Sequence, residues 1–371
     1  MTQENMEQKT AKKKYFVWVL LVFGILSRFF PLEEFLQQSR ANNGLMYKAR
    51  EASVEEVTRF IQEGADVNTA DSLGYTPLLL AAEHNSNPEV LRVLIENGAD
   101  ISATVKKGPW QECTPFMLAA MRNPNPEVLR VLIQNGADVS ATAREGLQWQ
   151  RCTPLMLAAL HNSNPEILRV LIENGADVNA TIDVSSNSRG VTMIMFGKGL
   201  VDNRRGITPL MVAALKNENP EVLRTLIESG ANVNAADRRG ATPLMWAAKE
   251  YSTLDVLRVL IEKGANVNAA DADGKTPLMF ALNNLRFLIE NGADVNAADK
   301  RGRTPLILAA RRNSNHYILP ILIENGANVM AKDEDGKMAL DYAEKNSALK
   351  RTDEYNLLRE KTLVGMNKGQ H

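Results

Sequence analysis

A short string that recurs along the chain constrains its fold more than any other feature. Thr-Pro followed by apolar residues and an Ala-rich tail reads TPLLLAA at its first appearance and TPLILAA at its last. The threonines that open this string are Thr76, Thr114, Thr153, Thr208, Thr242, Thr276 and Thr304. A second string, Gly-Ala-Asp or Gly-Ala-Asn followed by Val or Ile, begins at Gly64, Gly98, Gly136, Gly175, Gly230, Gly264, Gly292 and Gly326. Self-similarity at a fixed period indicates a repeat architecture.

The spacing of the two strings gives the period and shows where length has been added. The interval from each Thr to the next Gly is 22 residues, except from Thr276 to Gly292, where it is 16. The interval from Gly to the next Thr is 12 in most units and lengthens to 16, 17 and 33 before Thr114, Thr153 and Thr208. The two basal intervals sum to a period of 34 residues. All added length falls in one segment, which is typical of the binding face of a repeat protein.

Local chemistry predicts two helices and a turn in each unit. Thr is a good N-cap, and Pro fits the first helical position because its missing N–H would be unpaired there anyway. An Asn-Pro-Glu string, first seen at residues 87–89, starts a second helix by the same logic. That helix ends at the Gly, which readily adopts a positive φ. An Asp-x-x-Gly string then predicts a turn that leads to the next Thr.

A helix–turn–helix unit of this length that carries TPLxxAA and GADVN resembles the ankyrin repeat. The resemblance covers residues 44–364 and implies an all-α solenoid of about nine units with β-hairpin fingers and a concave face that binds partner proteins. The chain departs from the family pattern at the residue after Thr-Pro-Leu, where His is common. Here this position predicts an apolar packing ladder rather than a metal site, and it is held by Leu79, Met117, Met156, Met211, Met245, Met279 and Ile307.

The ends and two internal units deviate from the pattern. Residues 45–64 lack Thr-Pro and residues 350–364 are strongly charged, which predicts capping units. The unit that Thr276 opens is short between its two helices, so we expect a tight turn there. In the next unit Pro320 takes the place of an Arg inside the second helix. This predicts a kink and weaker stacking, and we expect the substitution Pro320→Arg to raise stability.

Composition argues against several classes of function. The net charge is −1, which disfavours a nucleic-acid partner. The four histidines are not clustered at metal-ligand spacing, and the chain has no Gly-rich phosphate loop and no nucleophile elbow. We therefore expect no catalysis, no cofactor, no metal and no small-molecule substrate. The two cysteines, Cys113 and Cys152, occupy equivalent places in neighbouring repeats, either as a disulfide or as two isolated thiols.

The N-terminus has the pattern of an export signal. Lysines at 12–14 precede residues 15–32, which begin YFVWVLLVFGILS. We expect a basic cytoplasmic tail over 1–14, an uncleaved signal anchor over 15–32 and a polar linker over 33–43. A cleaved signal peptide and a buried soluble helix are the alternatives. The charge pattern predicts a single-pass membrane protein with the repeats on the extracytoplasmic side, as in a bacterial inner membrane facing the periplasm.

The elongated fingers and the concave face supply the candidate partner-binding residues. Two fingers each place a Trp four residues before the Thr, and the third insertion, residues 181–205, contains VTMIMFGKGLV and predicts an extended β-hairpin. Aromatic and Met residues are enriched in interfaces. From these fingers we select Trp110, Trp149, Met193, Ile194, Met195 and Phe196. The resemblance adds residues after Ala-Ala and at fingertips, namely Met121, Arg122, Leu160, His161, Leu215, Arg238, Arg239 and Arg301.

Together these features predict a membrane-anchored, non-catalytic scaffold that binds a protein of unknown identity. A secreted ankyrin-repeat effector with a cleaved signal and a non-catalytic subunit of an enzyme complex are the alternatives. The fingers have a second interpretation, because neighbouring fingers can also pack on one another as a small satellite core. Residues 365–371 are expected to form a C-terminal tail.

Overall fold

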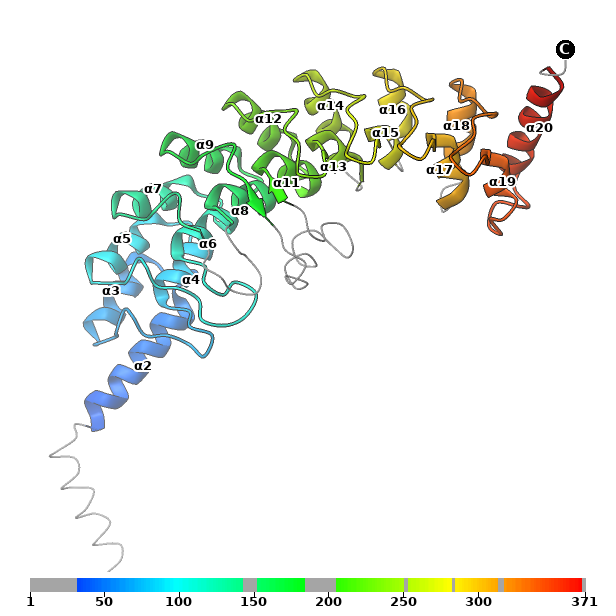
Figure 1. Ribbon diagram of the computed structural model, residues 1–371. Coiled ribbons are helices and arrows are strands. Elements are labelled where there is room, and N and C mark those ends of the chain that lie inside the picture. Colours follow the sequence, from blue (N-terminus) through cyan, green and yellow to red (C-terminus); the bar gives the residue numbers. More distant parts are fainter. Residues whose placement is uncertain are drawn as a thin grey trace, which may run out of the picture.

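Pairs of helices stack side by side along the chain and form a curved solenoid (Figure 1). The computed structural model describes residues 32–142, 152–183, 205–249, 253–281, 284–312 and 317–368. The inner helices line the concave side and are α4 (Pro77–His84), α6 (Pro115–Arg122), α8 (Pro154–His161), α11 (Pro209–Lys216), α13 (Pro243–Lys249), α15 (Pro277–Phe280), α17 (Pro305–Arg312) and α19 (Ala339–Ala343). The all-α solenoid predicted from the repeats is confirmed.

A second row of helices forms the convex side. It comprises α3 (Val54–Gln62), α5 (Pro88–Glu96), α7 (Pro126–Gln134), α9 (Pro165–Glu173), α12 (Pro220–Glu228), α14 (Leu254–Glu262), α16 (Leu285–Glu290) and α18 (Ile318–Glu324). The two ends of the described chain are closed by α2 (Leu32–Lys48) and α20 (Asp353–Lys368). Each inner helix packs against the inner helix of the next unit and against its own outer helix.

The helix boundaries follow the capping chemistry that the sequence predicts. The Thr76 hydroxyl accepts a hydrogen bond from the Leu79 N–H at 3.4 Å, and Pro77 takes the first helical position. At the outer helix the Asn87 side chain accepts from the Glu89 N–H at 3.1 Å. The helix then ends before Gly98, which adopts a φ of +88°. This is a conformation that a residue with a Cβ reaches only with strain.

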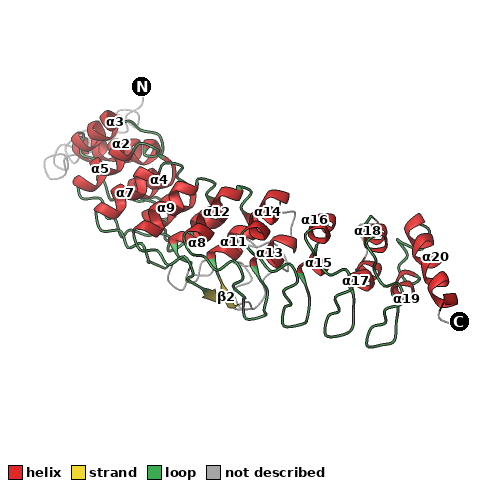
Figure 2. Ribbon diagram, turned by 90° about the horizontal axis from the view of Figure 1, so that it is seen from above, coloured by secondary structure: helices red, strands yellow, loops and turns green. Residues whose placement is uncertain are grey.

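The finger loops lie side by side along one edge of the solenoid (Figure 2). Backbone hydrogen bonds join neighbouring fingers, for example from the Arg238 N–H to the Arg205 carbonyl at 2.8 Å and from the Ala272 N–H to the Arg239 carbonyl at 2.7 Å. At the long insertion, β1 (Ile182–Asp183) pairs antiparallel with β2 (Arg205–Ile207), with Ile182 opposite Ile207. These strands agree with a hairpin stem, and the insertion between them lies outside the described residues.

Two apolar clusters hold the solenoid together. The larger runs between the inner and outer helices from α2 to α20. The second lies beneath the finger arms of the N-terminal and central units and contains the first five residues of the apolar packing ladder, Leu79 to Met245. Met117, Met156, Met211 and Met245 are buried there. The packing role that the sequence predicts for these methionines is confirmed.

The N-terminal cap differs from the expected linker. Residues 33–43, predicted as a polar spacer, belong to α2, which packs on α3 and α4. A Cβ added to Gly44, inside α2, would lie only 2.4 Å from the Phe60 ring. Gly44 therefore allows α2 and α3 to approach closely, at a cost in helix propensity that the packing offsets. The first unit thus has two helices rather than the single one expected.

The predicted membrane location is wrong, as the lengths and compositions of the helices show. Among the residues that the structure describes, no helix combines the length and the apolar character needed to cross a bilayer. This finding contradicts the predicted single-pass location with the repeats on the extracytoplasmic side. The predicted basic tail and all but the last residue of the predicted anchor, residues 15–32, lie outside the described residues.

The two irregular units contain shortened helices. In the unit that Thr276 opens, α15 has 4 residues and α16 has 6, as the missing residues predict. The contact between α15 and α17 is accordingly the sparsest among the inner helices from α4 to α19. The predicted kink at Pro320 is wrong, because α18 begins at Ile318 and Pro320 lies in its first turn. An N–H at this position has no intrahelical partner to lose.

Candidate protein-binding surface

The elongated finger before α6 brings an aromatic ring to the ends of two inner helices. The Arg122 guanidinium, at the end of α6, lies 4.7 Å from the centre of the Trp110 ring. The imidazole of His161, at the end of α8, meets the same ring edge-on, with centroids 6.1 Å apart and planes at 88°. Trp110 is half-buried against the second apolar cluster. Three of the residues selected from the sequence therefore form one cluster, here called the Trp110 cluster.

A buried carboxylate orients the cation of this cluster. Glu83, at the end of α4, is only 3% exposed, and its Oε1 accepts a hydrogen bond from Arg122 Nη1 at 2.6 Å. The His84 Nε2 lies 3.5 Å from the other carboxylate oxygen. A carboxylate so removed from water requires such a partner, and the pair fixes Arg122 in place. The ion pair crosses from one unit to the next, so the cluster joins three consecutive inner helices.

The environment shifts the pKa values of the neighbouring titratable groups. Burial, aided by the Arg122 charge, lowers the pKa of His161 to about 4, so its imidazole is neutral at pH 7. Burial also lowers the pKa of His84, against the opposing effect of Glu83. The pKa of Tyr75 rises to about 12, first through burial and then through the Glu83 charge. At neutral pH the two imidazoles are therefore neutral, and Arg122 carries the positive charge of the cluster.

The two cysteines lie beneath this surface as free thiols. Both Cys113 and Cys152 are buried in the second apolar cluster, and no disulfide joins them. Burial raises the pKa of each thiol to about 12, so neither is a thiolate at neutral pH. Of the two alternatives left open by the sequence, the structure has the isolated thiols. In the described part of the chain no group of three or more His, Cys, Asp or Glu side chains is arranged to hold a metal ion.

Three selected residues on the inner helices face the core instead of the concave surface. They are Met121, Leu160 and Leu215, all buried in the second apolar cluster. Each follows a ladder methionine by four positions, so both residues lie on the same face of the helix. Only the next residue in each unit is exposed, as in Arg122, His161 and Lys216. On these helices the second residue after Ala-Ala is therefore the one exposed to solvent.

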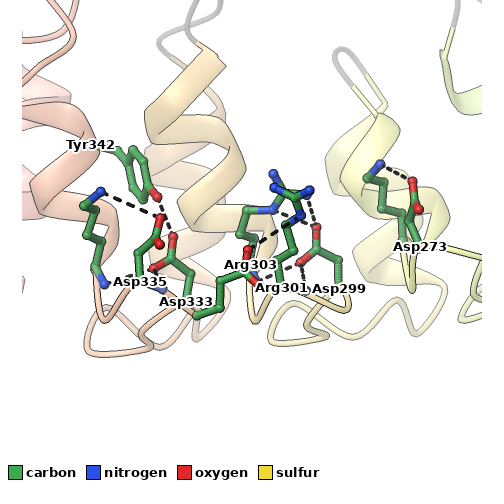
Figure 3. A network of polar contacts seen from close by, with 10 residues as sticks. Asp273, Asp299, Arg301, Arg303, Asp333, Asp335 and Tyr342 are labelled. Atoms are coloured by element: carbon green, nitrogen blue, oxygen red, sulfur yellow. Dashed lines mark hydrogen bonds and ion pairs between the residues drawn. The ribbon is translucent and has the colours of Figure 1, made fainter.

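The selected fingertip residues lie at the solvent-exposed tips of their turns. Arg238, Arg239 and Arg301 are exposed. The Asp that starts each turn holds its shape: Asp299 Oδ1 accepts the N–H groups of Arg301 and Arg303, and its Oδ2 pairs with the Arg303 guanidinium at 2.7 Å (Figure 3). The acidic residues at these turns thus serve the turn, as the sequence predicts.

Charges alternate between neighbouring fingertips in the C-terminal half. Arg301 Nε lies 3.6 Å from a Glu334 oxygen of the next finger, and Asp273 pairs with Lys275 of its own finger at 2.9 Å (Figure 3). The positive charge of the basic fingertip residues is therefore partly neutralised by acidic neighbours. The remaining selected residues, Trp149, Met193, Ile194, Met195 and Phe196, lie outside the described residues.

A series of buried asparagines joins the units and was not singled out from the sequence. Asn162 lies just after α8, and its Nδ2 donates to the carbonyls of Ala120 and Asn123 in the preceding unit at 3.1 and 2.9 Å. Equivalent pairs of bonds are made by Asn85, Asn123 and Asn217. The signal that marks them is the Asn that follows each of these inner helices, eight residues after the helix-opening Pro.

The geometry defines the class of protein: a stacked-repeat scaffold that presents a concave face and a row of fingers for protein binding. The chain belongs to the ankyrin repeat family. A family model of ankyrin repeats in three copies matches residues 21–105, 104–182, 185–271 and 210–299. A second model, of ankyrin repeats in many copies, matches residues 288–343.

Curated relatives share only a short part of the chain. A mitochondrial disaggregase of Bos taurus is 47% identical over 62 residues, which is 17% of this chain and 9% of the relative. The mitochondrial disaggregase of Homo sapiens is 44% identical over 62 residues, with the same coverage of both proteins. The chain thus spans less than a tenth of the length of these relatives.

Proposed function

We propose that this chain binds a partner protein through its concave face, with the Trp110 cluster at the contact, and that it has no catalytic activity of its own. The observation that carries the proposal is the convergence of Trp110 and Arg122 with His161 of the next unit on the exposed ends of α6 and α8. Trp and Arg are the residue types that dominate binding energy in interfaces, especially when they are held rigidly.

Electrostatics supports the same assignment. The Arg122 guanidinium is fixed by Glu83 and by the Trp110 ring, so little side-chain entropy is lost when a partner covers it. Neighbouring His161 is neutral and presents a ring that both donates and accepts hydrogen bonds. A partner with an aromatic or amide group at this point fits the cluster.

Site-specific photo-crosslinking tests the location of the contact. We would place a photo-crosslinking side chain at His84, beside the cluster, and at Arg169 on the convex helix α9 as the matched control. Crosslinking of one protein from His84 and not from Arg169 is the expected result. Equal capture from both positions would contradict a concave contact.

The partner so identified then allows the cluster itself to be measured. We expect Trp110→Ala to weaken its binding roughly 30-fold in calorimetry, the loss of a typical aromatic hot spot. Trp110→Phe keeps the apolar bulk and should restore part of that loss. An unchanged Kd for a folded Trp110→Ala chain would remove the cluster from the contact.

A further inference from the structure

A ladder of asparagine side chains runs along the arms that precede the fingers. The Asn68 Nδ2 donates to the Gly98 carbonyl at 2.9 Å, and the Asn68 Oδ1 accepts from the Asp100 N–H at 2.8 Å. Each carboxamide thus closes a two-bond ring with the backbone of the next unit. The same ring is made by Asn179, Asn234, Asn268 and Asn296. We call this series the arm ladder.

The arm ladder is interrupted at two consecutive units, where serine replaces asparagine. The Ser102 hydroxyl donates back to Asp100 of its own turn at 2.6 Å, and Ser140 does the same to Asp138 at 2.8 Å. Within the described residues the Gly136 carbonyl and the Asp138 N–H consequently have no hydrogen-bond partner. These two groups are the ones that a carboxamide pairs in every intact junction of the ladder.

A cavity lies at the first interruption. It measures about 540 Å³ and is lined by Ser102, Gly136 and Asp138 together with the finger residues Lys106 and Glu112. Glu112 has a φ of +67°, the only positive φ of a non-glycine residue in the described part of the chain. A residue held in this sparsely populated conformation is often part of a functional site. Cavity, unpaired backbone groups and backbone strain therefore coincide at one place.

We propose that this cavity receives a carboxamide side chain, Asn or Gln, of the partner protein, which completes the arm ladder at Ser102. The proposal rests on the proposed function only in taking a protein as the source of the carboxamide. A carboxamide offers an N–H donor to the Gly136 carbonyl and an oxygen acceptor to the Asp138 N–H at the same time. The ring that it closes is the one that Asn68 closes one unit earlier.

Other side chains match the site less well. A carboxylate has no donor for the Gly136 carbonyl and meets the negative charges of Glu112 and Asp138, which also line the cavity. An ammonium group has no acceptor for the Asp138 N–H. Gly136 and Asp138 are exposed, so water pairs the group that such a ligand leaves, and the ligand gains one hydrogen bond where an amide gains two. The cavity therefore selects an amide over its charged isosteres.

The second interruption fixes the spacing in the partner. At Ser140 the Gly175 carbonyl and the Asp177 N–H likewise lack partners within the described residues. Packed helices lie about 8–10 Å apart, and an extended chain advances about 3.3 Å per residue. An extended partner that follows both interruptions thus carries its two carboxamides about three residues apart.

Amide NMR of the full-length chain tests the proposal with a synthetic probe. The probe is the peptide Gly-Gln-Gly-Gly-Gln-Gly, and its control replaces both Gln by Glu. We expect a saturable shift of the Asp138 N–H resonance with the Gln peptide and none with the Glu peptide. Equal responses to both peptides, or no response to either, would overturn the proposal.

Two substitutions connect the response to the ladder. Ser102→Asn lets the chain pair Gly136 and Asp138 itself, so we expect a higher Tm and loss of the Asp138 response. Asn234→Ser opens an equivalent gap in an intact junction, so we expect a lower Tm and a new response at the Asn266 N–H. A response that survives in Ser102→Asn would contradict the assignment. Crosslinking from His84 tests the proposed protein-binding function independently of the result of the peptide experiment.

Discussion

The Trp110 cluster shows how one buried carboxylate organises a surface. Glu83 is almost without solvent contact, and removal of Arg122 leaves its charge uncompensated. An uncompensated buried charge is strongly destabilising. The position of Arg122 is therefore coupled to folding of the N-terminal units, and its guanidinium presents a fixed face toward the concave side.

The pKa of His161 predicts a pH dependence of stability. Its folded pKa of about 4 lies below the ordinary value of 6.5, so protons bind preferentially to the unfolded chain between these values. The stability that neutral His161 contributes is full above pH 6.5 and is lost as the pH falls toward 4. His161 retains exposed surface, and water screens part of the effect, so we expect a modest slope.

Urea unfolding of the wild type and of His161→Gln between pH 7 and pH 4 measures this contribution. Gln keeps a polar side chain of similar reach but does not titrate. We expect the wild type to lose more stability than the variant over this range. Parallel curves for the two chains would mean that the imidazole titrates normally in the folded state.

At the scale of the element, the effect of a proline on helix stability depends on its distance from the start of the helix. Pro320 of α18 and Arg224 of α12 lie at equivalent places, six residues before Gly326 and Gly230. Arg224 is the fifth residue of α12, whereas Pro320 is the third residue of α18. The first four N–H groups of a helix have no intrahelical partner, so Pro320 removes no bond.

We accordingly expect Pro320→Arg to change the free energy of unfolding by less than about 1 kcal/mol, with a small loss because the unfolded chain becomes more flexible. The matched substitution Arg224→Pro removes a helix bond and should cost about 3 kcal/mol. Thermal unfolding of both variants measures the difference. A clear rise in Tm for Pro320→Arg would mean that α18 extends toward its N-terminus once the proline is gone.

Sequence patterns predicted the helix boundaries well where the residues that fix a boundary lie within one repeat unit. Thr76 and Pro77 fix a helix start within a few residues, and Gly98 fixes a helix end, so both could be read from the chain alone. The burial of Met121 was missed because it depends on which helix face the next unit covers. The asparagine bonds, such as those of Asn162 to the preceding unit, were missed because their partners lie about 40 residues away.

At the scale of the whole molecule, the weakest junction sets how the solenoid opens. Each unit contacts only its neighbours, so stability is nearly a sum of unit and junction contributions. The shortened unit of α15 and α16 contacts α17 sparsely and divides the array into two stretches. We expect the stretch from α17 to α20 to open at lower free energy than the stretch from α4 to α12.

Hydrogen exchange of the full chain, followed by mass spectrometry, checks this order. Amides in α17 to α20 should exchange faster than those in α4 to α12, and the two sets should respond separately to low urea concentrations. Restoration of the six missing residues between α15 and α16 should bring the two rates together. A single common opening free energy across all units would show that the short junction transmits packing as well as the others.

The family and the scaffold class were predicted from the recurring TPLxxAA and GADVN strings, whose resemblance to the ankyrin repeat implied the fold. The candidate site was only partly predictable. Trp110, Arg122 and His161 were each selected from the chain, but their convergence depends on the path of one elongated finger. The interruption of the arm ladder at Ser102 is visible in the sequence only after the role of Asn68 is known.

The hydrogen bonds between neighbouring fingers give the solenoid an asymmetric elasticity. Bonds such as the one from the Arg238 N–H to the Arg205 carbonyl run along one edge, while the helices pack on the other. Bending that spreads the fingers stretches this line of hydrogen bonds. Because hydrogen bonds are short and directional, a small extension is enough to break them. Bending that brings the fingers together leaves that line slack and is opposed mainly by side-chain packing. The solenoid is therefore expected to resist bending that spreads the fingers more strongly than bending that brings them together.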